Sequence, residues 1–309
     1  MKTVLAADIG ATNARFALVE RPAGDARIVF ERTYPTASFP DFEPALAAFL
    51  GETRGEKIAR AAIAIAGPVA DDAGRLTNRA GWTVDRRALG RLGVEARLIN
   101  DFLALAHGVA HAVPDDYVTL QQGKGVQQAA IALVGAGTGL GVASLVWDGQ
   151  RYRASPSEGG HAGFAPRDDR QVELWRHLRA RHGRVSAERV VCGAGLAAIH
   201  EFLHGEALEA AEISRQALAE RSGGAARALA LFIDCYGAFA GDIALAFLAR
   251  GGVYVCGGIA AKLAHRLAEG DFLAAFNDKG RHRELLAEIP VRVVINEKLG
   301  LLGAARAAA

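Results

Sequence analysis

Glycine-rich turns between apolar runs are the first sign of phosphate chemistry in this 309-residue chain. In the segment GAGTGLG, glycines stand at every second position, at Gly135, Gly137, Gly139 and Gly141. Alternate glycines let a backbone approach a ligand closely and aim its N–H groups in one direction, which favours an anion such as phosphate. A flexible hairpin turn is the simpler interpretation. Four glycines in this spacing nevertheless favour a phosphate site.

The segment DIGATN supplies a second turn of similar form, with a carboxylate at its edge. Asp8 follows an apolar run and suits Mg²⁺, which binds few protein carboxylates and keeps several of its waters. Thr12 and Asn13 offer donors to phosphate oxygens. Alone, Asp8 and Asn13 would be ordinary turn residues. Neither GxxxxGK[ST] nor GxGxxG occurs, so the predicted phosphate turn is neither a P-loop nor a dinucleotide fingerprint.

Polar residues in three other segments are candidates for binding a polyhydroxyl ligand. They are Asn100, Asp101, Glu158, His161 and Glu188. Asn100 and Asp101 stand between a strand-like run and a helical one, where both residue types are also preferred N-caps. Glu158 and His161 flank two glycines and could form half of a metal site, but no third ligand with suitable spacing is present. Glu188 follows Ser186, which resembles an N-cap, so a purely helical interpretation is open there too.

The chemistry of this set is that of a sugar site. Its members are acceptors and donors with little positive charge, whereas a carboxylate or phosphate substrate would require Arg or Lys. Phosphate turns, a polyol cluster and a carboxylate together predict phosphoryl transfer to a sugar hydroxyl.

Strand-like runs must position these residues. Strand–turn–strand patterns cover residues 3–20 and 129–149. A strand at 60–70 is stopped by Gly67 and Pro68, and a strand at 96–101 leads into a helix near Phe102. Residues 251–267 are predicted to form a strand and a helix that are separated by Gly257 and Gly258. A strand at 289–297 and a helix at 300–309 follow. Two similar openings predict two related α/β lobes, residues 1–110 plus 297–309 and residues 111–296, with a ligand between them.

Composition excludes several other classes. A net charge of +2 and 51% hydrophobic residues are typical of a globular chain without a nucleic-acid partner. Residues 170–189 hold several Arg and His residues, which we interpret as a solvated helix in preference to a polyanion site. Cys192, Cys235 and Cys256 lack CxxC spacing, so we expect small buried hydrophobes in a reducing cytoplasm. The N-terminus has no signal-peptide pattern, and no uncharged apolar run reaches about 18 residues, so no membrane segment is expected.

Seven segments resemble those of one family, in order and over essentially the whole chain. They are DIGATNARFAL, INDFLALAHG, GAGTGLGVASLV, EGGHAGFAP, VSAERVVCGAGL, CGGIA and FNDKGRHRELLAEIPV. The chain resembles the bacterial glucokinases of the hexokinase–actin–Hsp70 superfamily, and it lacks the zinc-binding CxCGxxGC of the repressor–kinase (ROK) group. The resemblance implies an α/β fold of two ribonuclease-H-like (actin-like ATPase) lobes around a central cleft. It also implies ATP, Mg²⁺, glucose 6-phosphate as product, and a homodimer.

The resemblance also assigns roles to residues. It implies that Asp101 is the catalytic base and that glucose is bound by Asn100, Asp101, Glu158, His161 and Glu188. Asp8 would hold Mg²⁺ through water. The implied contacts to ATP are Asp8, Ile9, Gly10, Ala11, Thr12, Asn13, Gly135, Gly137, Thr138, Gly139, Gly257 and Gly258. Two positions depart from the family pattern, because Ala11 replaces a glycine and Asp242 stands where asparagine is frequent.

Three other functions are alternatives to a glucokinase. Another hexose or amino-sugar kinase would use the same cluster, since sequence does not size the pocket around the sugar 2-position. A sugar-responsive transcription regulator would need an added DNA-binding segment, for which a strand beginning near Thr3 and an Ala-rich terminal helix leave no room. An actin-like or chaperone ATPase would have no use for the polyol cluster.

Overall fold

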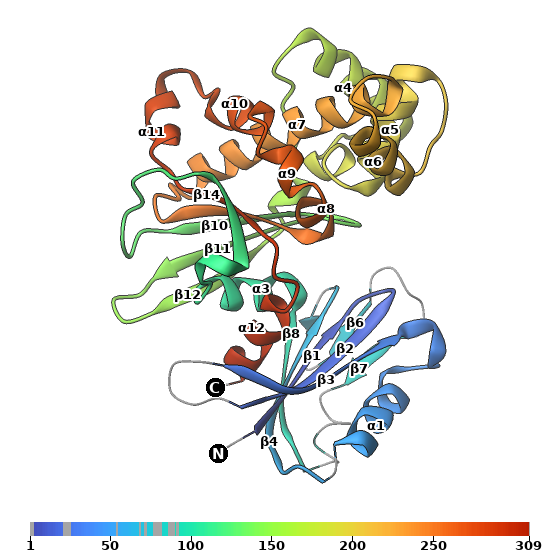
Figure 1. Ribbon diagram of the computed structural model, residues 1–309, viewed down its shortest axis with the longest axis vertical. Helices are drawn as coiled ribbons and strands as arrows, with labels where there is room; N and C mark the ends of the chain where they lie inside the picture. Colours follow the sequence, from blue (N-terminus) through green and yellow to red (C-terminus); the bar gives the residue numbers. More distant parts are fainter. Residues whose placement is uncertain are drawn as a thin grey trace. The chain divides into compact units, whose positions relative to one another are not determined.

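Two mixed β-sheets, each in its own unit, organise the chain (Figure 1). The computed structural model describes residues 3–20, 26–53, 55–67, 69–70, 73–76, 82–85, 90 and 93–308. Unit 1 comprises Met1–Ala112 and Glu297–Ala309, and unit 2 comprises Val113–Asn296. Pro68, expected to stop a strand, lies outside the described residues.

The sheet of unit 1 has the strand order β3-β2-β1-β4-β8. Its strands are β1 (Thr3–Ile9), β2 (Asn13–Glu20), β3 (Arg27–Pro35), β4 (Ile58–Ile65) and β8 (Glu95–Asn100). The predicted hairpin over residues 3–20 is confirmed, since β1 and β2 pair antiparallel with Asp8 opposite Arg15. The strands β1, β4 and β8 run parallel, so their carboxyl ends lie at one edge of the sheet. A separate small sheet contains β5 (Val69–Ala70), β6 (Ala73–Arg75) and β7 (Thr83–Asp85).

Alternation along β1 decides which face of this sheet carries Asp8. Leu5, Ala7 and Ile9 belong to the core cluster that also contains residues of α1 (Phe42–Glu52). Val4 and Ala6 belong to the cluster on the opposite face, with residues of α3 (Asp101–Val109) and α12 (Leu299–Ala307). Figure 1 shows α1 and α12 on opposite sides of the sheet. Because strand side chains alternate, Asp8 lies on the α3 and α12 face.

The helices α3 and α12 cross at glycines that leave no space for a side chain. A Cβ added to Gly108 of α3 would lie 2.2 Å from the main-chain oxygen of Leu299. A Cβ added to Gly303 of α12 would lie 1.9 Å from the main-chain oxygen of Ala104. The backbones therefore approach directly, and this contact fixes the helix that begins at Asp101.

The sheet of unit 2 has the strand order β12-β11-β10-β13-β14-β9. Its strands are β9 (Tyr117–Gln121), β10 (Ile131–Ala136), β11 (Leu140–Trp147), β12 (Tyr152–Ser157), β13 (Gly252–Cys256) and β14 (Val291–Val294). The hairpin predicted over residues 129–149 is confirmed as β10 and β11, which pair antiparallel. The strand and helix predicted around Gly257 and Gly258 are β13 and α8 (Gly257–Lys262).

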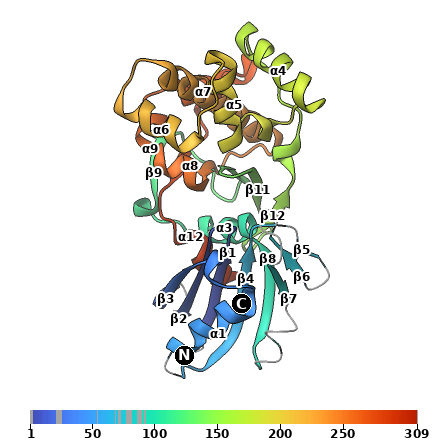
Figure 2. The ribbon, with the colours of Figure 1, turned by 90° about the vertical axis from the view of Figure 1, so that its right-hand side faces the viewer.

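Helices and short 3-10 turns complete unit 2. The α-helices besides α8 are α4 (Asp169–His182), α5 (Gly193–His204), α6 (Ala210–Ala219), α7 (Gly224–Ala246), α9 (Ala264–Leu267), α10 (Asp271–Asn277) and α11 (Arg283–Ala287). Two of the 3-10 turns are η3 (Gly159–His161) and η4 (Ala187–Arg189). Figure 2 shows α5, α6 and α7 grouped on one side of the strands, and their apolar residues form one core with β10 and β13.

The helix α7 has the length and composition of a membrane span, which the sequence did not lead us to expect. Its charged residues Arg227, Asp234 and Asp242 interrupt the apolar run. The most apolar stretch of α7 is 78% buried within the structure, as in a core helix. All three cysteines are free and buried, which confirms their expected role as small apolar residues.

Substitution at the α3–α12 crossing tests the packing directly. We expect Gly303→Ala to lower the free energy of unfolding by about 1–3 kcal/mol, because the added methyl group must displace the α3 backbone. Gly300→Ala, in the same helix, is the matched control, because the nearest atom to its Cβ position is 4.0 Å away. Denaturant unfolding of both variants measures the difference. Equal stability of the two variants would show that the crossing tolerates a side chain.

Candidate active site

The carboxyl end of β8 places Asn100 and Asp101 at the start of α3. Asn100 is the N-cap, since its Oδ1 accepts hydrogen bonds from the N–H groups of Phe102 (2.9 Å) and Leu103 (3.2 Å). Its Nδ2 donates to the main-chain oxygen of Gly67 at 3.3 Å. Asp101 is the first helical residue, and its Oδ1 accepts from Phe102 N–H at 2.8 Å. The helix thus begins one residue before the predicted position, with Asn100 as its cap.

The carboxylates of Asp8 and Asp101 influence one another in unit 1. Burial, together with the charge of Asp8, raises the pKa of Asp101 to about 6, although the Phe102 N–H opposes the shift. Burial also raises the pKa of Asp8, and Arg15 acts in the opposite direction. Asp8 and Ile9 are the last residues of β1, so the hairpin itself delivers this charge. A carboxyl group with a pKa near 6 is a stronger base than an ordinary aspartate and is still ionised at neutral pH.

The first glycine turn joins β1 to β2. Its ends are closed by a hydrogen bond from Gly10 N–H to the main-chain oxygen of Asn13 at 2.9 Å. The buried Thr36 binds the turn from β3's end, donating its N–H to Thr12 O (2.9 Å) and its hydroxyl to Ala11 O (2.6 Å). Among the described residues, no acceptor bonds the N–H groups of Ala11 and Thr12. Two consecutive donors therefore remain available for an anion.

The second glycine turn, residues 137–139, follows the same plan. Gly137 N–H donates to Gly139 O at 2.8 Å, and Gly193 N–H donates to Gly137 O at 2.9 Å. Within the described part of the chain, the N–H groups of Thr138 and Gly139 have no acceptor. Gly135 and Gly141 face each other in the strands below the turn, at ordinary negative φ. The alternating glycines therefore provide close approach and no left-handed backbone.

The three residues predicted to bind sugar from unit 2, which we call the sugar cluster after that prediction, lie close together: Glu158, His161 and Glu188. His161 Nε2 lies 3.7 Å from Glu158 Oε2, and His161 Nδ1 lies 3.8 Å from Glu188 Oε1. Their side chains are 92% (Glu158), 58% (His161) and 31% (Glu188) exposed. Ser186 is the N-cap of η4 and Glu188 lies in its first turn, as predicted, although the Ser186 side chain makes no capping hydrogen bond. Among the described residues, no three His, Cys, Asp or Glu side chains are placed so that they could hold a metal ion.

The third predicted motif begins α8 and packs against β10. Gly257 has φ of +91°, and a Cβ there would lie 2.4 Å from the main-chain oxygen of Ala136. Only glycine satisfies both conditions. A Cβ at Gly258 would meet no atom within 4 Å, so space lies in front of it.

Tyr236 of α7 connects the two strand ends that carry these motifs, and sequence reasoning missed it. Its buried hydroxyl accepts a hydrogen bond from Ala136 N–H at 3.1 Å. The same hydroxyl lies 3.1 Å from Val134 O and 3.3 Å from Cys256 O. A tyrosine in an apolar helical run carries no local signal of this role, because its partner Ala136 lies 100 residues away along the chain.

The structure explains both departures from the family pattern. Positive φ occurs at two described non-glycine residues, and Ala11 is not one of them, so alanine is accommodated without backbone strain. Asp242 pairs with Lys279 at 2.6 Å, and Lys279 also donates to Ala238 O at 2.9 Å. Asp242 thus joins α7 to the segment after α10, outside the predicted site residues.

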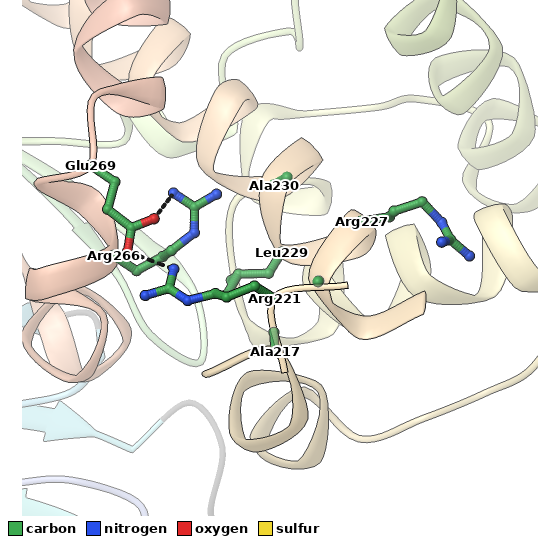
Figure 3. Close-up of a pocket in the computed structure, with 8 residues that line it drawn as sticks. Ala217, Arg221, Arg227, Leu229, Ala230, Arg266 and Glu269 are labelled. Carbon is green, nitrogen blue, oxygen red and sulfur yellow. Dashed lines mark ion pairs between the residues drawn. The ribbon is translucent and has the colours of Figure 1, made fainter. Parts of the chain in front are cut away.

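A cavity of about 520 Å³ lies elsewhere in unit 2, among α6, α7 and α9. Its lining includes none of the predicted site residues. Arg221 and Arg266 both pair with Glu269, at 2.5 Å and 3.1 Å. Figure 3 shows these two guanidinium groups directed at Glu269, whereas Arg227 points away from it. The paired charges make this cavity a poor candidate for the anion chemistry predicted above.

Comparison with known proteins decides the family. The sequence model of the family described as glucokinase matches residues 5–309. The chain belongs to the glucokinase family. A glucokinase of Nostoc sp. is 40% identical over 341 residues, covering 100% of this chain and 99% of that relative.

Solved structures agree with this assignment. A glucokinase from an Antarctic psychrotroph has a TM-score of 0.89 at 33% identity, covering 100% of this chain and 99% of that chain. A Balamuthia mandrillaris glucokinase in complex with glucose has a TM-score of 0.83 at 20% identity, covering 99% and 93%, a likeness of fold. The expected actin-like ATPase fold is confirmed. As a glucokinase family member, the chain is a sugar-phosphorylating enzyme.

Removal of one hydroxyl tests the role of Tyr236. We expect Tyr236→Phe to lower the free energy of unfolding by about 1–3 kcal/mol, because the buried Ala136 N–H loses its acceptor. Tyr254→Phe in β13 is the control, since the hydrogen bond that its hydroxyl accepts from Arg292 is long, at 3.4 Å. Thermal and denaturant unfolding give the comparison. If the free energy of unfolding falls no further in Tyr236→Phe than in the control, the Tyr236 hydroxyl does not hold the strand ends together.

Proposed function

We propose that the chain transfers the γ-phosphoryl group of ATP to the 6-hydroxyl of D-glucose, forming glucose 6-phosphate and ADP, with Asp101 as general base. The observation that carries this proposal is the environment of Asp101. Its carboxylate is held at the first turn of α3 by a main-chain N–H, and its pKa is raised to about 6. Proton transfer is most efficient when the pKa of the base lies near the working pH.

We assign sugar recognition to Asn100, Asp101, Glu158, His161 and Glu188. The Asn100 cap fixes its own amide and the adjacent Asp101 in one orientation. In unit 2, His161 between two carboxylates offers alternating donors and acceptors, which suits a row of sugar hydroxyls. The glucose in the Balamuthia mandrillaris structure supports the choice of ligand.

We assign the phosphates of ATP to the two glycine turns. The available N–H groups of Ala11, Thr12, Thr138 and Gly139 support this assignment, because consecutive main-chain donors bind phosphate oxygens. Ile9, Gly10, Asn13, Gly135 and Gly137 shape the two turns. Gly257 and Gly258 would face adenosine, and Gly258 leaves room for a flat ring because a Cβ there would meet no atom within 4 Å.

The charges around Asp8 fit Mg²⁺. In the described part of the chain, Arg15 is the cation that acts on Asp8, and its guanidinium also pairs with Glu297 at 2.9 Å. Asp8 and Asp101 therefore carry excess negative charge, which a hydrated divalent cation would compensate through Asp8. When bound, Mg²⁺ supplies positive charge to the β- and γ-phosphates.

The proposed reaction is a single displacement. Asp101 accepts the proton of the 6-hydroxyl while that oxygen forms a bond to the γ-phosphorus. The bond between the γ-phosphorus and the β,γ-bridging oxygen breaks, and both electrons leave with ADP. Phosphoryl transfer leaves little covalent work to the protein, so positioning and charge compensation provide most of the rate.

We further propose that the enzyme feeds glycolysis in the cytoplasm as a homodimer. Three buried cysteines without disulfides suit a reducing compartment. The dimer rests on the family resemblance alone. The domains inferred from the sequence, residues 1–110 plus 297–309 and residues 111–296, would carry the base and the sugar cluster, respectively.

Asp101→Asn tests the base, and a sugar panel in the same assay tests the substrate. Glucose-dependent ADP release by the unaltered enzyme should exceed release with mannose, fructose, N-acetylglucosamine or no sugar. In Asp101→Asn, kcat should fall by about 10²- to 10⁴-fold, the usual contribution of a general base. Glucose affinity and melting temperature should be retained, because the amide still accepts from Phe102 N–H and removes a buried charge.

Asp242→Asn is the matched control, since it makes the same chemical change outside the predicted site. Its kcat should equal that of the unaltered enzyme. Retention of kcat in Asp101→Asn would exclude Asp101 as the base. Rapid ATP hydrolysis without sugar would favour an ATPase, and a preference for another hexose would replace glucose as the substrate.

A further inference from the structure

We propose that Glu188 couples the sugar cluster to the second glycine turn, so that sugar and nucleotide each bind more tightly in the presence of the other. The proposal rests on the proposed function and deepens it. It gives Glu188 a role in nucleotide binding in addition to its assigned sugar contact. The coupling lies entirely within unit 2.

The two oxygens of the Glu188 carboxylate face different partners. Oε2 accepts a hydrogen bond from Leu140 N–H at 2.8 Å, directly after the glycine turn. Oε1 lies 3.8 Å from Nδ1 of His161 in the sugar cluster. A sugar hydroxyl bound to Oε1 would therefore act on the same rigid carboxylate group that holds the turn.

Glycines bring the two segments into direct contact. A Cβ added to Gly139 would lie 2.6 Å from Glu188 Oε2. A Cβ added to Gly160, within η3, would lie 2.0 Å from the main-chain oxygen of Leu140. Leu140 thus donates its N–H to Glu188, and its carbonyl lies against Gly160, so motion of η3 would be transmitted to the turn.

Glu158 provides the contrast within the same cluster. Its side chain is 92% exposed, and its Oε2 lies 3.7 Å from His161 Nε2. Among the described residues, its side chain makes no hydrogen bond or ion pair with the glycine turn. Of the two carboxylates in the sugar cluster, Glu188 contacts the segment of the glycine turn and the side chain of Glu158 does not.

Ordering provides the physical basis of the coupling. A hydrogen bond to an ionised carboxylate is stronger than a neutral one, so Glu188 restrains the turn in which Thr138 and Gly139 expose their N–H groups. A sugar that immobilises Glu188 reduces the ordering still required when nucleotide binds. Linkage requires that nucleotide then tighten sugar binding by the same factor.

Nucleotide binding to the sugar-free enzyme is the decisive measurement, made by calorimetry with Mg²⁺ and the analogue AMP-PNP. Glu188→Ala should weaken binding about 3- to 10-fold, because the turn loses a charge-assisted hydrogen bond. Glu158→Ala is the matched control and should leave nucleotide affinity unchanged while weakening glucose binding. Glu188→Gln should recover part of the nucleotide affinity, since its amide oxygen can accept from Leu140 N–H without the strength of a charged acceptor.

Two further binding measurements complete the test. In the unaltered enzyme, saturating glucose should tighten AMP-PNP binding by about fivefold or more. Gly139→Ala, which displaces Glu188 Oε2, should weaken glucose binding to the nucleotide-free enzyme. If Glu188 contacted the sugar alone, Glu188→Ala would leave AMP-PNP binding to the sugar-free enzyme unchanged. Gly139→Ala would then leave glucose binding unchanged.

The outcomes separate this proposal from the proposed function. If the unaltered enzyme binds glucose and AMP-PNP but Glu188→Ala leaves the sugar-free nucleotide affinity unchanged, the coupling is wrong and the kinase function stands. If the unaltered enzyme binds neither ligand, the proposed function fails and the coupling fails with it. Unfolding curves confirm that each variant is folded.

Discussion

Burial of two carboxylates that repel one another is the constraint on which unit 1 is built. Asp8 and Asp101 each lose solvation, and the charge of Asp8 makes ionisation of Asp101 harder still. Such a pair persists only where the surrounding structure is held by other interactions. The hairpin of β1 and β2 fixes Asp8, and the Asn100 cap fixes Asp101. The glycine crossing of α3 and α12 keeps that helix in place.

Unit 2 solves a different problem, which is to hold exposed main-chain donors in a fixed geometry. A turn of small residues has little stiffness of its own. Here the carbonyl of Gly137 is bound by Gly193 N–H, and Leu140 N–H is bound by Glu188. Tyr236 ties the ends of β10 and β13 together from below. The neighbouring segments thus supply the rigidity that the glycines lack.

Sequence reasoning succeeds where the signal is local. Apolar runs interrupted by glycine located both hairpins and the start of α8, because strand alternation and turn chemistry act over a few residues. It placed the N-cap at Ser186 correctly, but it did not reveal that the Ser186 side chain makes no capping hydrogen bond. It also missed Thr36 and Tyr236, whose partners are distant along the chain. Ordinary residue types at such positions carry no local signal, since tertiary contact alone gives them their role.

The raised pKa of Asp101 joins the fold to the proposed chemistry, and it can be observed without turnover. A pH titration of ¹³C-labelled aspartate carboxyl groups by NMR, in the ligand-free enzyme and in Asp8→Asn, measures it directly. The account predicts that Asp101 titrates with a pKa of about 6, and that Asp8→Asn lowers this pKa because the repelling charge is gone. An Asp101 that titrates near 4 in the unaltered enzyme, the ordinary aspartate range, would contradict it.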